Sequence, residues 1–237
     1  ELIRINDISK SQGVKQNIAI RINPDVDAKT HIKITTGKAE NKFGIEYDYT
    51  ESIYKIAADL KNINIAGISV HIGSQITSLK PFKKAYTIMY DIIKNLRSIG
   101  HKIDHVDLGG GLGVSYTTEE NIPTFKEYAN LIQSIFGNAD IKVYIEPGRL
   151  LVANSGLLIT KVTDVKTTTQ KTFIIVDAAM NDFIRPTLYG SYHEILPVRN
   201  NLGTSNKVYD IVGPICETGD YFAKNRKMNS VKIGSIN

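Results

Sequence analysis

A repeated alternation of short apolar runs with amphipathic stretches constrains this chain more than any other feature of its sequence. Four runs have strand length and are nearly continuous in apolar residues: NIAIRIN (17–23), AGISVHIG (66–73), HVDLGGG (105–111) and KVYIEPGR (142–149). Such runs are typical of parallel strands that are buried on both faces. From residue 66 their starts lie roughly forty residues apart, with a helical pattern between them. The alternation predicts βα units, in a (β/α)8 barrel or a doubly wound sheet.

Three amphipathic patterns predict helices. Thr50 can cap the first, in which the apolar spacing is helical at Ile53, Ile56, Ala57 and Leu60. Pro81 opens the second and Gly100 ends it; we expect its buried face to hold Phe82, Ala85, Met89, Ile92 and Leu96. Pro123 opens the third and Gly137 ends it; we expect its buried face to hold Phe125, Tyr128, Ala129, Ile132 and Phe136.

The pattern changes after Arg149. The stretches that follow are rich in β-forming residues and have no helix between the first two of them: GLLITKVTDVKT (156–167), KTFIIVDAAMN (171–181) and DIVGPIC (210–216). We therefore predict a partial barrel over 1–150 and a partial β-sandwich or barrel-like domain over 151–237. A complete barrel needs eight strand–helix units, and four or five are readable here, so we expect the barrel to begin upstream of Glu1.

Composition excludes several classes of protein. Hydrophobic residues make up 42% of the chain, far more than a disordered protein carries. The net charge of +5 comes from Lys and Arg that are interleaved with acids, which indicates solvated surface and no nucleic-acid partner. The polar first residues ELIRINDISK do not resemble a signal peptide, and no apolar run is long enough for a membrane span. The single cysteine, Cys216, fits a reducing cytoplasm.

Unusual polar residues and glycines share one location, the C-terminal ends of the predicted strands. They are Asn23, His71, Gly109, Gly110, Gly111, Glu146 and Arg149. In a βα barrel the loops at that end converge on the active site. The glycine run in DLGGGLG (107–113) either makes a tight turn or offers backbone N–H groups to a phosphate. A dinucleotide fingerprint would need a glycine where this chain has Val114.

The single polar residues have two interpretations each. Glu146 can pair with Arg149, or it can hold a cationic ring nitrogen. His71 can be a core histidine or can belong with the polar turn Gly73–Gln75. Arg185 and Tyr189 can be ordinary loop surface or can grip a carboxylate.

Cys216 and Glu217 combine a thiol with an acid beside a glycine turn. A metal site is not expected, because no other Cys and no suitably spaced His lie near Cys216. A nucleophilic cysteine is conceivable, but the sequence offers no local base for it.

Five motifs occur in an order that resembles the diaminopimelate decarboxylases, which are fold-type III pyridoxal-phosphate (PLP) enzymes with an alanine-racemase-like barrel. They are HIGSQI (71–76), DLGGGLG (107–113), IEPGRLLVANSG (145–156), MNDFIRPTLYGSYHEI (180–195) and GPICETGD (213–220). The segment RINPDVDAKTHIKITTGKAENKFGI (21–45) is also similar to this family. The resemblance implies decarboxylation of meso-2,6-diaminopimelate to L-lysine by a cytoplasmic homodimer with PLP as cofactor.

The resemblance also implies site roles. His71 would stack on the PLP ring, Glu146 would pair with its nitrogen, and the phosphate would lie on Ser74, Gly109, Gly110 and Gly111. Arg149 would contribute to the cofactor site and, with Arg185 and Tyr189, bind the carboxylate that the substrate keeps. Cys216 and Glu217 would reach the active site of a second subunit, where Glu217 meets a substrate ammonium group. His71, Cys216 and Glu217 form the expected catalytic set.

One feature departs from the family. The lysine that holds PLP there lies in a motif resembling Y-A-V-K-A-N, and this chain has no such segment. The family's closing tyrosine near G-A-Y is also missing, so we expect the 237-residue chain alone to be inactive. Alternatives are a fold-type III decarboxylase of ornithine, arginine or a carboxylated polyamine, and a non-catalytic PLP-binding relative. A nucleic-acid module is supported by the pI of about 9.1 alone.

Overall fold

The computed structural model describes residues 1–237 except 29–35, 38–41, 118–119, 199–206 and 237. Part of the segment 21–45 that resembles the family therefore lies outside the described residues. The chain divides into two compact units. The first comprises residues 1–115 and 121–154, and the second comprises 116–120 and 155–237. The segment 116–120 joins the second unit although the strand–helix pattern places it in the first.

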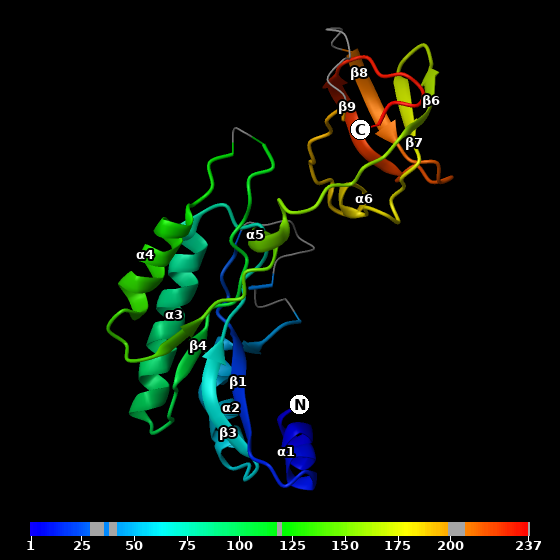
Figure 1. The fold of residues 1–237 in the computed structure, drawn as a ribbon. Coiled ribbons are helices and arrows are strands. Elements are labelled where there is room, and N and C mark those ends of the chain that lie inside the picture. The colour runs from blue at the N-terminus through cyan, green and yellow to red at the C-terminus, as the bar shows by residue number, and fades with distance from the viewer. Residues whose placement is uncertain (29–35, 38–41, 118–119, 199–206, 237) are drawn as a thin grey trace. The chain divides into compact units, whose positions relative to one another are not determined.

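The first unit contains a five-stranded sheet in which every pairing is parallel (Figure 1). Its strands are β1 (Gln16–Asn23), β2 (Ile45–Glu46), β3 (Ile63–Ser69), β4 (His105–Asp107) and β5 (Lys142–Tyr144). They lie in the order β2-β1-β3-β4-β5. Four of the five are the strands that the apolar runs predict, although β3 begins and ends earlier than its run. The α/β prediction with a parallel sheet is confirmed.

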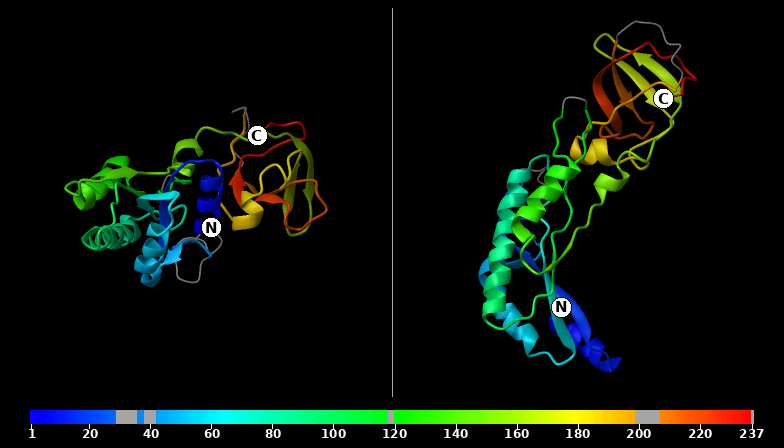
Figure 2. Two further views of the ribbon diagram at one scale, coloured as in Figure 1. Left: turned by 90° about the horizontal axis from the view of Figure 1, so that it is seen from below. Right: turned by 60° about the vertical axis from the view of Figure 1, so that its left-hand side comes forward.

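Helices connect these strands and contribute much of the core. They are α1 (Leu2–Ser11), the 3-10 turn η2 (Tyr47–Tyr49), α2 (Thr50–Ala58), α3 (Leu79–Ser98), α4 (Phe125–Phe136) and the short α5 (Arg149–Val152). Figures 1 and 2 show α3 and α4 side by side. All five predicted core residues of α3 are buried, and they pack in one cluster with Ile20, Ile68 and Val106 of the sheet.

Two helix predictions were wrong in detail. Phe125 is 68% exposed, Ala129 is exposed, and Ile56 is 52% exposed, although periodicity alone places all three inward. In α4 the buried face includes Leu131 and Ile135, which pack against the core. In α2 the buried Tyr54 replaces Ile56, because the Tyr54 hydroxyl donates a hydrogen bond to the Gly67 carbonyl oxygen (2.9 Å).

The helix starts also differ from expectation. Tyr49, not Thr50, is the N-cap of α2, and the Thr50 hydroxyl donates to the Tyr47 carbonyl oxygen instead. Helix α3 begins before Pro81, with the Ser78 hydroxyl accepting the Lys80 N–H. Thr124 caps α4 in a reciprocal arrangement with Glu127, which satisfies two N–H groups at once. Helix α1 was not predicted.

The register of the sheet aligns one row of polar side chains. Arg21 pairs with Ser69, Ser69 pairs with Asp107, and Asp107 pairs with Tyr144. Neighbouring residues Ile20, Ile68 and Val106 point to the opposite face, where the helices cover them. The polar row therefore lies on the face that α2, α3 and α4 do not cover.

The second unit is built on a four-stranded mixed sheet, so the predicted β-rich region is confirmed. Its strands are β6 (Val162–Thr167), β7 (Thr172–Val176), β8 (Lys207–Val212) and β9 (Tyr221–Met228), in that order. Strand β9 was not predicted, because its charged residues Lys224, Arg226 and Lys227 hide the alternation. A short helix, α6 (Arg185–Tyr189), follows β7. The core of this unit includes Val162, Ile174 and Tyr209.

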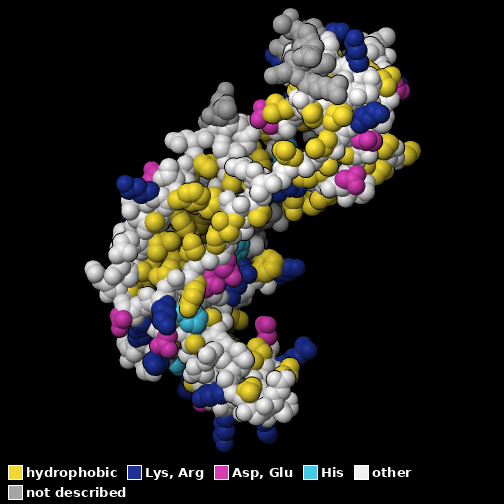
Figure 3. Space-filling view, viewed as in Figure 1, with side chains coloured by type: hydrophobic (Ala, Val, Ile, Leu, Met, Phe, Trp, Pro, Cys, Tyr) yellow, Lys and Arg dark blue, Asp and Glu magenta, His cyan; other side chains and the backbone are white. Residues whose placement is uncertain are grey.

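Strand β5 forms one edge of the first sheet, and large apolar side chains at its end and in the following helix α5 are exposed. They include Tyr144 (52%), Leu151 (67%) and Val152 (63%). Figure 3 shows hydrophobic side chains gathered on this side of the first unit. No helix of the described residues is both long and apolar enough to cross a membrane.

Candidate active site

The loops after β3 and β4 are joined to each other by hydrogen bonds. The Ile76 N–H donates to the Gly111 carbonyl oxygen (2.8 Å), and the Gly113 N–H donates to the Ile76 carbonyl oxygen (3.0 Å). The side-chain amide of Gln75 makes two further bonds to the Val114 backbone, donating to its carbonyl (2.6 Å) and accepting its N–H (3.1 Å). The HIGSQI and DLGGGLG motifs therefore form one structure at the C-terminal end of the sheet.

The glycine run is required by close packing of backbone. A Cβ atom at Gly110 would overlap the Glu146 carbonyl oxygen, and one at Gly109 would overlap the Val70 carbonyl oxygen. Gly109 also has a φ of 66°, which disfavours other residues. The Glu146 N–H donates to the Gly109 carbonyl oxygen (2.8 Å), which ties the loop after β5 to the same run. Three predicted site segments thus meet in the first unit.

His71 is half-buried where these loops meet. Its Nδ1 atom accepts the Gly110 N–H (3.2 Å), so this nitrogen carries no proton. Its carbonyl oxygen accepts hydrogen bonds from Arg21 Nη2 (3.2 Å) and the Thr36 hydroxyl (2.9 Å). Burial lowers the pKa of His71, the positive charge of Arg21 lowers it further, and Asp107 opposes both effects. The imidazole is therefore held neutral near pH 7.

Arg21 and Asp107 belong to the site, and the sequence interpretation missed both. Burial lowers the pKa of Arg21, while the charges of Glu146 and Asp107 act to raise it. Asp107 Oδ1 accepts the Gly109 N–H (2.8 Å), so this carboxylate fixes the start of the glycine run. A signal existed in the sequence, because Arg21 is the single charged residue in the apolar run 17–23.

Donors for an anion are present beside Ser74. The Ser74 hydroxyl accepts a hydrogen bond from Arg149 Nη2 (3.2 Å). Within the part of the chain that the structure describes, the backbone N–H groups of Ser74 and Gly111 have no hydrogen-bond partner. The N–H groups of Gly109 and Gly110 are already bonded to Asp107 and His71. A guanidinium, a hydroxyl and two unpaired N–H groups fit a phosphate.

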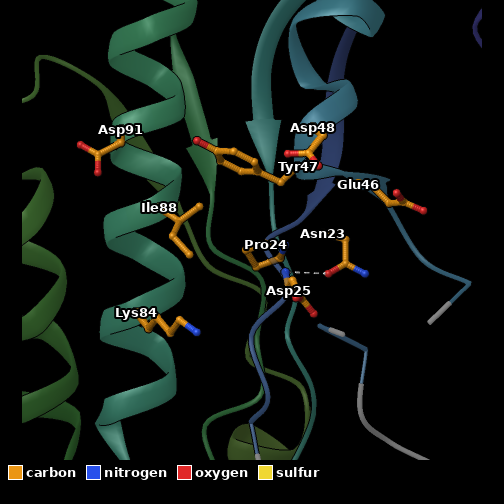
Figure 4. A pocket seen from close by; sticks show the side chains of 9 residues that line it. All are labelled: Asn23, Pro24, Asp25, Glu46, Tyr47, Asp48, Lys84, Ile88 and Asp91. Carbon is orange, nitrogen blue, oxygen red and sulfur yellow. Dashed lines mark hydrogen bonds between the residues drawn. The ribbon is translucent and has the colours of Figure 1, made fainter. Parts of the chain in front are cut away.

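A pocket of about 400 Å³ lies between the end of β1 and helix α3 (Figure 4). It is lined by Asn23, Pro24, Asp25, Glu46, Tyr47, Asp48, Lys84, Ile88 and Asp91. Of the polar residues and glycines predicted at the strand ends, Asn23 alone lines this pocket. The Asn23 amide oxygen accepts the Asp25 N–H (3.1 Å), so this side chain stabilises a turn.

The second unit holds Arg185 and Tyr189 at the two ends of α6. Gly190 ends the helix in the left-handed conformation (φ 61°), and the chain turns back. His193 then returns to Arg185, and the Arg185 Nε–H donates to His193 Nε2 (3.3 Å). The guanidinium also lies over the rings of Tyr116 and Tyr189, each 5.7 Å from the Arg185 Cζ atom to the ring centre.

Cys216 and Glu217 lie in a loop that a buried acid organises. Asp220 is 3% exposed, and its two carboxylate oxygens accept the N–H groups of Met180 and Ile215 (2.7 Å each). Cys216 is a free, exposed thiol. Asp220 lies within GPICETGD (213–220) and His193 within MNDFIRPTLYGSYHEI (180–195), but no local spacing distinguishes either residue from its neighbours.

The predicted residues are thus distributed over the two units. The first contains His71, Ser74, Gly109, Gly110, Gly111, Glu146 and Arg149, and the second contains Arg185, Tyr189, Cys216 and Glu217. The contacts described above bring the first set together, whereas the second set lies in two segments, helix α6 and the loop before β9. These contacts define where the side chains lie, and the binding roles remain predictions.

Comparison with known proteins gives a consistent result. Residues 1–153 match the family described as pyridoxal-dependent decarboxylase, pyridoxal binding domain. The diaminopimelate decarboxylase of Zymomonas mobilis is 46% identical over 237 residues, which cover 100% of this chain and 56% of that protein. The chain therefore spans about half the length of the curated relatives it matches.

Solved structures share the fold. The crystal structure of diaminopimelate decarboxylase from Helicobacter pylori complexed with L-lysine matches with a TM-score of 0.93 at 39% identity, over 99% of this chain and 58% of that one. The arginine decarboxylase of Paramecium bursaria Chlorella virus, at 21% identity, shares the fold with a TM-score of 0.83 over 100% of this chain and 62% of that one. The fold prediction, a partial barrel followed by a β-rich region, is confirmed. This chain belongs to the pyridoxal-dependent decarboxylase family.

Proposed function

We propose that this chain carries cofactor-binding and substrate-binding residues of an enzyme that converts meso-2,6-diaminopimelate to L-lysine and CO2. Family membership supports the cofactor, and 46% identity to a diaminopimelate decarboxylase along the whole chain supports the substrate. The ornithine and arginine alternatives have weaker support, because the arginine decarboxylase neighbour is 21% identical.

The cofactor site would be formed by the joined loops of the first unit. Ser74, Arg149 and the unpaired N–H of Gly111 would hold the phosphate, while Gly109 and Gly110 shape the loop. The bond from Arg149 to Ser74 favours the phosphate over the substrate carboxylate as the partner of Arg149. His71 would present a neutral imidazole to the ring, as its lowered pKa requires.

PLP, when bound, supplies an electron sink for the bond that loses CO2. Glu146 would keep a proton on the ring nitrogen, because a nearby carboxylate favours the charged form of that nitrogen. Arg21 would orient Glu146 through its positive charge. The residues of the first unit would therefore bind and orient the cofactor, and Glu146 would hold one proton on its ring nitrogen.

The substrate assignment depends on one observation in the second unit. Arg185 is half-buried, and within the described residues no carboxylate pairs with it. A guanidinium in this state suits the bidentate binding of a carboxylate. Diaminopimelate keeps one carboxylate after decarboxylation, whereas ornithine and arginine keep none. Tyr189 would complete this part of the site beside Arg185.

Cys216 and Glu217 would act across a subunit boundary in a cytoplasmic homodimer, with Glu217 meeting the distal ammonium group of the substrate. Their exposure in this chain is compatible with contact to a second subunit. Subunits that carry Arg185→Ala and Glu217→Ala separately would then be inactive alone and would recover activity when mixed. Absence of recovery after verified subunit exchange would contradict shared sites.

The direct test is L-lysine formation from meso-diaminopimelate with added PLP, using protein from the complete gene. Ornithine and arginine serve as competing substrates, and the 237-residue chain serves as the control. We expect L-lysine from the complete protein alone. Turnover of ornithine or arginine in its place would refute the assignment of Arg185 to a retained carboxylate.

A further inference from the structure

His193 lies at the centre of the side chains that surround Arg185. It comes from the segment that follows Gly190, eight residues after Arg185, and reaches Arg185 because the chain turns at Gly190. Its Nε2 atom accepts the Arg185 Nε–H (3.3 Å). Ser191 Oγ lies 3.2 Å from the same nitrogen. Since Arg185 has N–H donors and no acceptor, Nε2 carries no proton and the imidazole is neutral.

Two aromatic rings pack against the imidazole, and a hydrogen bond holds the His193 backbone. The Phe183 ring packs edge-on against it, with ring centres 4.6 Å apart, and the Tyr116 ring does so at 5.2 Å. The His193 carbonyl oxygen accepts a hydrogen bond from Arg226 Nη2 (2.9 Å) on strand β9. An acceptor held this firmly limits the rotation of the Arg185 side chain.

This arrangement determines which atoms of Arg185 remain for a ligand. Nε is bonded to His193, and within the described part of the chain neither terminal nitrogen has an acceptor. The two Nη groups can therefore form parallel bonds to one carboxylate. Because the imidazole is neutral, it leaves the positive charge of Arg185 available to a ligand. A carboxylate in place of His193 would neutralise that charge.

We propose that His193 is a positioning residue, which holds Arg185 through Nε so that both Nη groups face the carboxylate retained by the substrate. This inference rests on the proposed function. It makes His193 a determinant of specificity for amino acids that keep a carboxylate, without contact between His193 and the substrate.

The test compares two substitutions at one position in the PLP-loaded, full-length enzyme. His193→Phe keeps the aromatic packing and removes the acceptor, whereas His193→Gln places an amide oxygen within reach of Arg185. Calorimetric titration with L-lysine and with cadaverine, which lacks the carboxylate, gives the readout. We expect His193→Phe to weaken L-lysine binding about ten-fold, the effect of one hydrogen bond to a charged group, and to leave cadaverine unchanged. His193→Gln should restore most of the loss.

Kinetics give a second readout. In His193→Phe the KM for meso-diaminopimelate should rise more than kcat falls, and the PLP absorption spectrum should not change. Equal weakening of L-lysine and cadaverine, or unchanged binding of both, would overturn the positioning role while the wild type still forms L-lysine. A wild-type enzyme that forms no L-lysine would overturn the proposed function, and this inference with it. His101→Phe, which alters a histidine packed on Tyr54 in the first unit, is the matched control and should bind both ligands normally.

Discussion

The two units hold their candidate site residues by different means. In the first unit, backbone hydrogen bonds join the loops after β3, β4 and β5, and glycines are needed where the loops touch. In the second unit, side chains do this work, as when His193 holds Arg185 and Asp220 holds the loop of Cys216. The first arrangement fixes the shape of the loops, and the second fixes the positions of charged side chains. Substitutions should therefore affect the first unit through packing and the second through individual polar contacts.

Two glycines with nearly the same backbone conformation test this difference most strongly. Gly109 has a φ of 66° and Gly190 a φ of 61°. A Cβ at Gly109 would overlap the Val70 carbonyl oxygen, whereas a Cβ at Gly190 would meet no atom within 4 Å. Gly190→Ala should cost about 1 kcal/mol of stability, from the left-handed conformation alone. Gly109→Ala should cost roughly 3 kcal/mol or more, because overpacking adds to that strain.

Hydrogen exchange followed by mass spectrometry can measure both variants, since it reports on each unit separately. The chain has no tryptophan, so ordinary fluorescence would not separate the units. Faster exchange should be confined to the first unit in Gly109→Ala and to the second unit in Gly190→Ala. Equal losses in the two variants would mean that packing around the glycine run is not what distinguishes the units.

This difference also explains what could be predicted from the sequence. Strand β1 and the buried face of α3 follow from local periodicity, which needs no knowledge of distant residues. The exposure of Phe125 does not, because the direction of a helix face depends on what packs against it. In the site, the glycine run was recognisable because its three glycines are consecutive in the sequence, although the contacts that require them are distant. Arg21 stands out as the charged residue of an apolar run, but its role does not follow from the sequence, because its partner His71 lies 50 residues away.

A loss of stability of intermediate size is expected when the side chain that joins two loops is replaced. Gln75 makes both of its hydrogen bonds to the Val114 backbone, which is 5% exposed. Gln75→Leu leaves a buried N–H and a buried C=O without partners, so a loss of about 2 kcal/mol is expected. Ser191→Ala, the counterpart in the second unit, should cost roughly 0.5 kcal/mol, since Arg185 still bonds to His193.

Urea titration followed by pulsed proteolysis of each unit measures this pair. Gln75→Leu should also weaken PLP binding, because loss of the bonds to Val114 would displace Gly111 and its unpaired N–H. A Gln75→Leu variant as stable as the wild type would show that the backbone bonds between Ile76, Gly111 and Gly113 hold the loops without help from the side chain.

The smallest effect is a difference in acid sensitivity between the units. In the first unit, burial and then Arg21 lower the pKa of His71, so the unfolded chain takes up this proton at a higher pH than the folded chain. Stability from His71 is therefore lost as the pH falls below about 6.5. In the second unit, burial acts to raise the pKa of Asp210, but hydrogen bonds from Lys171 and the Asn225 N–H outweigh it and the pKa is lowered. Stability from Asp210 is present above a pH of about 4 and is lost as the pH falls through the lowered pKa.

Hydrogen exchange recorded from pH 7 to pH 3 and corrected for intrinsic exchange should show the first unit opening before the second. His71→Asn, which retains an acceptor near the position of Nδ1, should remove the step near pH 6.5 in the first unit and leave the second unit unchanged. Asp210→Asn should remove the step below about pH 4 in the second unit alone. If His71→Asn leaves the step near pH 6.5 in place, another group in the first unit is responsible for it. The hydrogen bond from the Gly110 N–H to His71 would then not be the source of the acid sensitivity of the first unit.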